Sequence, residues 1–310
     1  MQILAKSAAD PAQIKDKLEK GCDGIEIQLL GDFLDEKNNA QYYYQKIISC
    51  AGADVQVVHM PLIKHQDVNL ELLTYPVYLK AFKKAVLLSQ MLAEEYHHNV
   101  ILILHNTLTL DQYQHMPVLL REIETLLEYA CDNFPQVEYA IENILPLELP
   151  EGKTPLGRNG FGFDNVDLTS YFNERFETCN KFGTVIDTCH AMASYRMLAH
   201  ILTEDHNGSL KRLRLEDFFI KNHGLLKVIH LTNVHSMGFN PGEHGCSFEP
   251  DSELDVLFLN RFFDLYYKYA SGVPITIEVY EKDYLDSQSY LKTKNMIQKY
   301  VMPPRATSSI

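Results

Sequence analysis

Short runs of apolar residues alternate with longer segments of helical periodicity along nearly the whole chain. Eight of these runs are almost continuously apolar, which is typical of parallel strands that are covered on both faces. The predicted strands are Met1–Ala5, Gly24–Leu30, Val55–Pro61, Val100–Asn106, Val137–Asn143, Gly183–Ala191, Lys227–His235 and Pro274–Glu281.

Helical periods follow the apolar runs, and the first has clear start and stop signals. Asp10 and Pro11 supply an N-cap and a proline at the first helical position, and Gly21 ends the helix. A helix also begins after the sixth strand, before a polar segment. The remaining helices are predicted over Ala40–Ser49, Tyr75–Tyr96, Val118–Cys131, Val166–Asn180, Ser252–Tyr269 and Ser287–Tyr300.

Eight strands in alternation with eight helices predict an α/β fold. Units of this length indicate a (β/α)8 TIM barrel, formed as a single domain by residues 1–310. The competing doubly wound sheet usually has a glycine-rich turn after its first strand, and Leu4–Pro11 has none. The long loops Leu145–Phe163 and Thr203–Gly224 are interpreted as insertions into one barrel.

Composition agrees with a globular protein. The 310 residues are 46% hydrophobic and 22% charged, which is enough material for a large core. No leader peptide or membrane-spanning run is visible, and the six cysteines are scattered without CxxC spacing. We therefore expect reduced thiols, a cytoplasmic location and no membrane partner. The formal net charge of −13 does not attract a polyanion.

Imidazole and carboxylate side chains close six of the predicted strands, at the end of the barrel where active sites are built. They are His59, His105, Glu142, Asp187 with His190, His230 and Glu278. One such residue alone is usually a cap or a hydrogen-bonded rim group. In VIDTCHAMAS, for example, Asp187 could cap a helix that has His190 on its first turn.

Seven such groups on one rim require compensation, because like carboxylates repel and burial adds a desolvation cost. A divalent cation removes the problem. Mixed imidazole and carboxylate ligands suit Zn or Mn, with Co, Fe or Mg as alternatives. We expect one to three ions.

The stretch IDTCHA at Ile186–Ala191 closely resembles a motif of the endonuclease IV type of abasic-site nuclease. The shorter motifs VHMP, LHN, IEN, IHLTN and IEVYE arrive in the order of the same family. On these motifs, nearly the whole chain resembles the xylose isomerase-like TIM barrel superfamily. That superfamily holds sugar isomerases and epimerases as well as the nucleases.

The nuclease branch of this resemblance implies two ions that share Glu142. The other ligands would be His59 and His105 for the first ion, and Asp187, His230 and Glu278 for the second. His190 would hold a third ion, together with an Asp-x-His sequence after strand seven. The segment Asn233–Phe248 contains no Asp, so His235 or His244 would have to substitute, with His235 nearer the expected position.

The isomerase branch implies one ion, held by Glu142, Asp187, His230 and Glu278. In this branch Glu142 and Glu278 also move protons at the substrate carbons, and His190 helps to hold substrate oxygens. His235 and His244 are further candidates for substrate contacts. The chemistry requires a base beside a carbonyl and a metal that stabilises the enediolate oxygens.

A DNA substrate would require arginines and lysines around the site. The loop Gly31–Asn39 is acidic where the nuclease family places DNA contacts, and Lys211–Phe219 is interpreted as a solvated helix face. Lys153 and Arg158 either meet an anionic group of a small substrate or lie in a solvated loop.

We therefore predict an isomerase or epimerase that acts on a sugar, sugar phosphate or polyol. The alternative is an endonuclease IV-like phosphodiesterase that acts at abasic sites in DNA. A metal-binding barrel without activity is the third hypothesis. The complete set of four isomerase ligands argues against it, and the sequence leaves the oligomeric state open.

Overall fold

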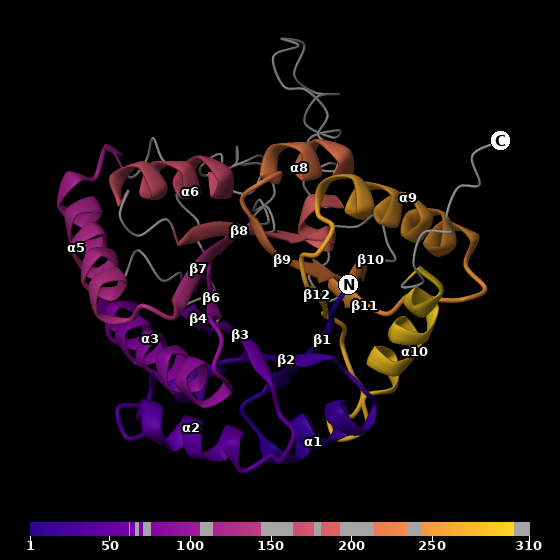
Figure 1. The fold of residues 1–310 in the computed structure, drawn as a ribbon, viewed down its shortest axis with the longest axis horizontal. Helices are drawn as coiled ribbons and strands as arrows, with labels where there is room; N and C mark the ends of the chain where they lie inside the picture. Colours follow the sequence, from indigo (N-terminus) through magenta and orange to yellow (C-terminus); the bar gives the residue numbers. More distant parts are fainter. Residues whose placement is uncertain are drawn as a thin grey trace, which may run out of the picture.

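The computed structural model of the protein describes residues 1–300 except 62, 66–67, 71–75, 106–113, 144–163, 177–180, 193–213 and 235–243. Eight parallel strands close into a barrel in the order β1-β12-β9-β8-β7-β6-β3-β2 (Figure 1). They are β1 Ile3–Ala8, β2 Gly24–Gln28, β3 Val55–His59, β6 Val100–Leu104, β7 Val137–Glu142, β8 Phe182–Asp187, β9 Leu226–Leu231 and β12 Ile275–Ile277. The predicted (β/α)8 TIM barrel is confirmed.

Helices form an outer ring around these strands (Figure 1). Those in the described part of the chain are α1 Pro11–Glu19, α2 Ala40–Ile48, α3 Pro76–Tyr96, α5 Pro117–Asn133, α6 Asp164–Arg175, α8 Leu215–Asn222, α9 Glu253–Tyr269 and α10 Gln288–Ile297. The helix predicted after the sixth strand begins as expected, since residues 188–192 are helical. None of the described helices meets the length and apolarity needed to cross a bilayer.

Local sequence signals explain where several helices begin. The Asp10 carboxylate accepts hydrogen bonds from the backbone N–H groups of Ala12 and Gln13, and Pro11 occupies the first helical position. Asn39 caps α2 in the same way. Gly21 follows α1 with a φ of 74°, a left-handed conformation that favours glycine.

Helix α8 lies within Thr203–Gly224, which was expected to be a loop, and several smaller elements were not predicted either. The turn Gly31–Leu34 is a 3₁₀ helix, η1, and a second one, η3 (Gln298–Tyr300), follows α10. Two short antiparallel hairpins extend from the C-terminal ends of barrel strands: β4 Ile63–His65 with β5 Val68–Leu70, and β10 Asn233–Val234 with β11 His244–Cys246. Such short segments have too few residues to show a period in the sequence.

The cysteine prediction needs one correction. Cys22, Cys50, Cys189 and Cys246 are free thiols, as expected. The prediction is wrong for Cys131 in α5, which is disulfide-bonded. Disulfide pairing depends on how two sulfur atoms approach in the folded chain, which spacing along the sequence does not reveal.

The barrel interior is filled by a layer of apolar side chains below the strand ends. Six of them form one buried cluster: Leu4, Val57, Ile103, Ala140, Val185 and Val228. A second and larger apolar cluster includes residues from both strands and helices, such as Ile25 in β2 and Phe82 in α3. The inner layer closes the barrel and forms the floor on which polar side chains can stand.

Close packing at the start of β8 gives a first prediction. A Cβ atom on Gly183 would lie 2.6 Å from the Leu225 carbonyl oxygen and 2.3 Å from the Lys227 side chain. Gly183→Ala should therefore lower the free energy of unfolding by about 1–3 kcal/mol, measured by urea denaturation. Gly31→Ala, which would meet nothing within 4 Å, is the control and should change stability by less than about 0.5 kcal/mol. Equal stability of the two variants would contradict this packing.

Candidate metal centre

The polar residues at the strand ends follow from the period of the strands. Side chains two positions apart point to the same face of a strand, so each inner-layer residue is followed by another that faces the interior. These following residues are Lys6, His59, His105, Glu142, Asp187 and His230. The strand register places Asp187 beside His230, and Lys6 beside Glu26. Polar groups from separate strands are thereby collected above one apolar floor.

Glu142 lies at the centre of this polar layer and is almost fully buried. Its Oε2 atom lies 3.2 Å from His59 Nε2 and 2.6 Å from His105 Nε2. Its Oε1 atom lies 3.2 Å from His230 Nδ1 and 3.5 Å from His190 Nδ1. The two oxygens of one carboxylate therefore face two different sets of imidazoles.

Two groups of side chains meet at Glu142. Glu142, Asp187, His230 and Glu278 form the four-residue group, whose donor atoms all lie within 4.8 Å of one another. His59, His105 and Glu142 form the histidine group, which meets the same limit. A third group, Glu26, His59 and His230, overlaps with both. The structure thus brings together six of the seven predicted metal ligands, in the sets that the family resemblance implies.

Asp187 both caps a helical turn and belongs to the four-residue group. Its Oδ1 atom accepts a 2.7 Å hydrogen bond from the His190 backbone N–H, so Asp187 does cap the helical turn at residues 188–192. The same carboxylate supplies a donor atom to the four-residue group. Asn143 fixes the backbone of Asp187, because its side chain bonds both the N–H and the carbonyl oxygen of Asp187.

His190 stands at the edge of the centre. Its Nδ1 atom donates to the Asn143 carbonyl oxygen at 2.6 Å and lies 3.9 Å from Asp187 Oδ1. The candidates that would accompany it at a third ion cannot be placed beside it. His235 lies outside the described residues, and of His244 only the backbone, in β11, is described. The third ion and both substrate-contact assignments therefore stay predictions.

Charges within the centre oppose the effect of burial. Burial alone would raise the pKa of Glu142, but His230 and His105 hold that pKa well below its usual range. Burial would lower the pKa of His230, but the charges of Glu26 and Glu142 hold it well above its usual value. Burial, with the charge of Lys6, lowers the pKa of His59 to about 4, so this ring is neutral near pH 7.

The neutral His59 ring shows that the donor set fits a cation. Its Nδ1 atom lies 2.8 Å from the Met60 carbonyl oxygen, which can only accept, so Nδ1 carries the proton. The Nε2 lone pair of His59 then faces the Glu142 oxygen 3.2 Å away, and two acceptors confront each other. A divalent ion bound by both atoms would turn this repulsion into coordination.

Lys6 and Glu26 belong to the same layer, although neither was predicted as a site residue. Glu26 is fully buried, and its Oε2 atom lies 3.0 Å from His230 Nε2 and accepts from Thr276 Oγ1 at 2.8 Å. Lys6 Nζ lies 3.3 Å from Glu26 Oε1 and 2.8 Å from Glu278 Oε2. A charged residue in the middle of a buried apolar strand is the signal that could have identified them.

The position of Glu26 defines how His230 is held. A carboxylate on one ring nitrogen fixes the tautomer and the orientation of a histidine, so that the other nitrogen is aimed at a metal. Here Glu26 contacts Nε2, and Nδ1 is directed at Glu142 and Glu278. Although Glu26 also satisfies the distance limit for a ligand, its contacts with Lys6 and Thr276 favour an orienting role.

Comparisons with known proteins support the fold. No protein-family model matches the sequence, and no curated protein matches it. An L-ribulose 3-epimerase structure matches with a TM-score of 0.54 and 12% identity, covering 96% of this chain and 94% of that one. A xylose isomerase domain protein from Alicyclobacillus acidocaldarius subsp. acidocaldarius matches with a TM-score of 0.55, 13% identity and 97% coverage of both chains.

A third structure, a xylose isomerase-like TIM barrel protein from Mycobacterium smegmatis in complex with magnesium, has a TM-score of 0.52. It is 12% identical and covers 96% of both chains. The protein therefore has the fold of the xylose isomerase-like TIM barrels over nearly its whole length, as the motifs predicted. At this level of identity the likeness concerns the fold.

A second prediction concerns Glu26. Glu26→Gln keeps the size of the side chain but weakens the grip on His230 and removes a negative charge, so affinity for Zn²⁺ or Mn²⁺ should fall by about 10- to 100-fold. Isothermal titration calorimetry on the metal-stripped protein measures this directly. Glu138→Gln is the matched control, since Glu138 contacts Lys227 and Asn99 outside the centre. If both variants bind metal as the wild type does, Glu26 does not orient a ligand.

Proposed function

We propose that the protein is a divalent-metal-dependent enzyme and that the four-residue group holds its essential ion. The proposal is carried by one observation: three carboxylates and one imidazole, from four strands or strand ends, place donor atoms within 4.8 Å of one another. The three carboxylates of this buried set repel one another, which favours a bound cation. Mixed nitrogen and oxygen donors favour Zn or Mn, with Co, Fe or Mg as alternatives.

We propose further that the reaction is isomerisation or epimerisation of a sugar or sugar phosphate. The bound ion would stabilise negative charge on the substrate oxygens. Glu278 has a side chain that is 21% exposed, so it is the carboxylate of the group best placed to exchange a proton with a substrate carbon. Glu142 would act from the buried side, and His190, at the edge, would help to hold a substrate hydroxyl, since its Nδ1 donates to Asn143 and its Nε2 can accept a hydrogen bond.

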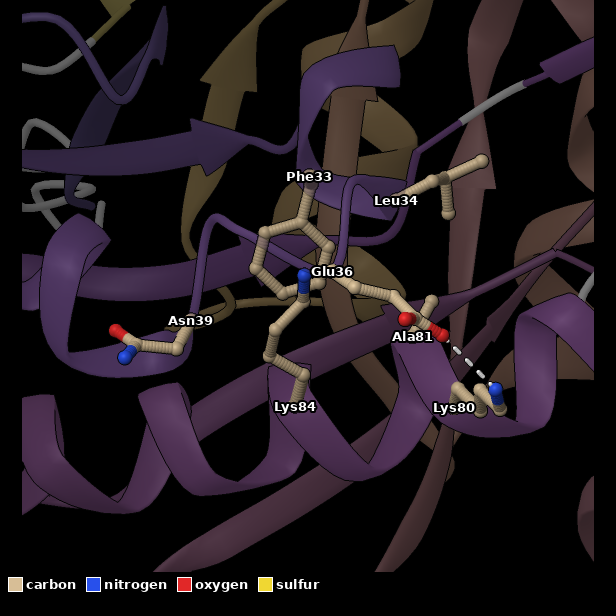
Figure 2. A pocket seen from close by; sticks show the side chains of 7 residues that line it. All are labelled: Phe33, Leu34, Glu36, Asn39, Lys80, Ala81 and Lys84. Carbon is tan, nitrogen blue, oxygen red and sulfur yellow. Dashed lines mark hydrogen bonds and ion pairs between the residues drawn. The ribbon is translucent and has the colours of Figure 1, made fainter.

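The surroundings of η1 favour a small substrate over a polyanion. The acidic loop Gly31–Asn39, which contains η1, packs against α3 and borders a cavity of about 400 Å³. Lys80 and Lys84 line part of this cavity (Figure 2). Both lysines are engaged locally: Lys80 pairs with Glu36 at 3.0 Å, and Lys84 donates to the carbonyl oxygens of Asp35 and Asn38. The loop therefore offers a phosphate backbone little attraction where a nuclease would need it.

Changing Glu278 tests the proposed reaction. Glu278→Gln keeps the volume of the side chain but removes a ligand charge and a base, so metal affinity should weaken and turnover should fall by at least about 100-fold. The metal-free protein should be less stable than the wild type, because Lys6 and His230 each lose the Glu278 charge that contacts them. Asp187→Asn should reproduce the loss of metal.

The assay for these variants is exchange of solvent deuterium into ketoses, aldoses and their phosphates, next to the carbonyl group. Enolisation leaves this label even when net turnover is slow. Full metal occupancy and full activity in Glu278→Gln would show that Glu278, which follows β12, is neither a metal ligand nor a base. Absence of metal from the wild type, even after reconstitution with Mn or Zn, would remove the whole proposal.

A second candidate function is hydrolysis of a phosphodiester, as at an abasic site in DNA. It is favoured by one specific observation: Glu142 directs Oε2 at His59 and His105 and Oε1 at His230, the arrangement expected of a carboxylate that bridges two ions. Phosphodiester hydrolysis draws on two ions for water activation and for charge on the leaving oxygen. In the isomerase proposal these two histidines bind no ion, and of the two only His105 can hold Glu142 by a hydrogen bond.

The number of ions separates these candidates. If the enzyme is a one-ion isomerase, His59→Ala and His105→Ala should leave about one ion per chain, as in the wild type. If it is a two-ion hydrolase, the wild type should bind two ions and each variant one, measured by elemental analysis. His98→Ala is the control, because His98 pairs with Asp54 outside the centre. Two ions together with cleavage of an abasic-site duplex would overturn the preference for sugars.

A further inference from the structure

Lys6 places a permanent positive charge inside the candidate metal centre. It lies on β1, its side chain is 13% exposed, and its ammonium group contacts Glu278 Oε2 at 2.8 Å and Glu26 Oε1 at 3.3 Å. Two carboxylates in direct contact favour the charged ammonium form of this lysine.

The fold fixes this charge in place. The register of β1 and β2 sets Lys6 directly beside Glu26, and Glu26 is held in turn by His230 and Thr276. The ammonium group is thus anchored on one side by a fully buried carboxylate. Its second carboxylate, Glu278, belongs to the four-residue group and is the more exposed of the two.

The Oε2 atom of Glu278 contacts both Lys6 and His230. This atom lies 2.8 Å from Lys6 Nζ and 2.9 Å from His230 Nδ1. Nδ1 is the nitrogen that His230 would offer to an ion in the four-residue group. An ion that binds through Oε2 must draw this oxygen away from the ammonium group or share it, and an ion that binds through Oε1 would still share the carboxylate with Lys6. In either case a dication and an ammonium ion would lie close together, and like charges at such separations repel strongly in a buried site.

We propose that Lys6 is an internal counter-ion that competes with the divalent ion for Glu278 and thereby sets the metal affinity of the centre. In the metal-free protein it neutralises Glu278 and Glu26, so the barrel mouth is stable before metal arrives. In the metal-bound protein its charge opposes the ion, so the metal is held less tightly than the ligands alone would allow. The inference rests on the proposed metal centre and is independent of the reaction catalysed there.

The test compares metal binding by the full-length wild type, Lys6→Met and Lys6→Arg, using calorimetry with Zn²⁺ or Mn²⁺ added to metal-stripped protein. Lys6→Met removes the competing charge and should bind metal at least about tenfold more tightly. Lys6→Arg keeps the charge and should stay within about threefold of the wild type. Affinity that is unchanged or weaker in Lys6→Met would overturn the proposal.

Thermal unfolding supplies a readout that does not depend on activity. Without metal, Lys6→Met should melt at a lower temperature than the wild type, because buried Glu26 loses the ammonium group that contacts its Oε1 atom. Saturating metal should restore much of that difference, since the ion then supplies the missing charge. A metal-free melting temperature equal to that of the wild type would contradict the counter-ion role.

Two further outcomes are distinguishable. If Lys6→Met does not fold, the double variant with Glu26→Gln, which removes the pair without changing net charge, replaces it. Its metal affinity should exceed that of Glu26→Gln alone, and equality would overturn the proposal. If the wild type itself binds no metal, the metal centre fails along with the competition at Glu278. If the wild type binds metal and the loss of Lys6 does not change the metal affinity, only the proposed competition at Glu278 is refuted.

Discussion

The structure of the site depends on how the buried Glu142 carboxylate is compensated. A lone carboxylate at this depth would be strongly unfavourable, and the barrel surrounds it with imidazoles from four different strands or strand ends. These rings are fixed in turn, His59 by the Met60 carbonyl and His230 by Glu26. The positions of most other polar side chains in the centre follow from this one requirement.

Much of the fold and site was predictable because both obey short periods. The apolar runs gave all eight strands, and the ends of those runs marked the polar residues from His59 to Glu278. Side chains alternate between the two faces of a strand, so a residue two positions after an inner apolar residue faces the same interior. Asp187 illustrates this rule, because it follows Val185 of the inner layer by two positions.

What the sequence did not predict depends on contacts between distant segments. Lys6 and Glu26 were not predicted because neither ends its apolar run, although Lys6 follows Leu4 by the same two positions. The contact of Lys6 with Glu278 requires β1 and β12 to be neighbours, which only the closed barrel shows. The disulfide at Cys131 is likewise a matter of folded geometry. The sequence identifies candidate residues, and the closed barrel shows which of them are in contact.

The central claim is that a divalent ion binds among Glu142, Asp187, His230 and Glu278. The most direct measurement is anomalous X-ray diffraction at the metal absorption edge, from crystals of the protein reconstituted with Mn²⁺ or Zn²⁺. The account predicts an anomalous peak coordinated by these four side chains. Metal bound elsewhere on the chain, with no peak among the four residues, would contradict it.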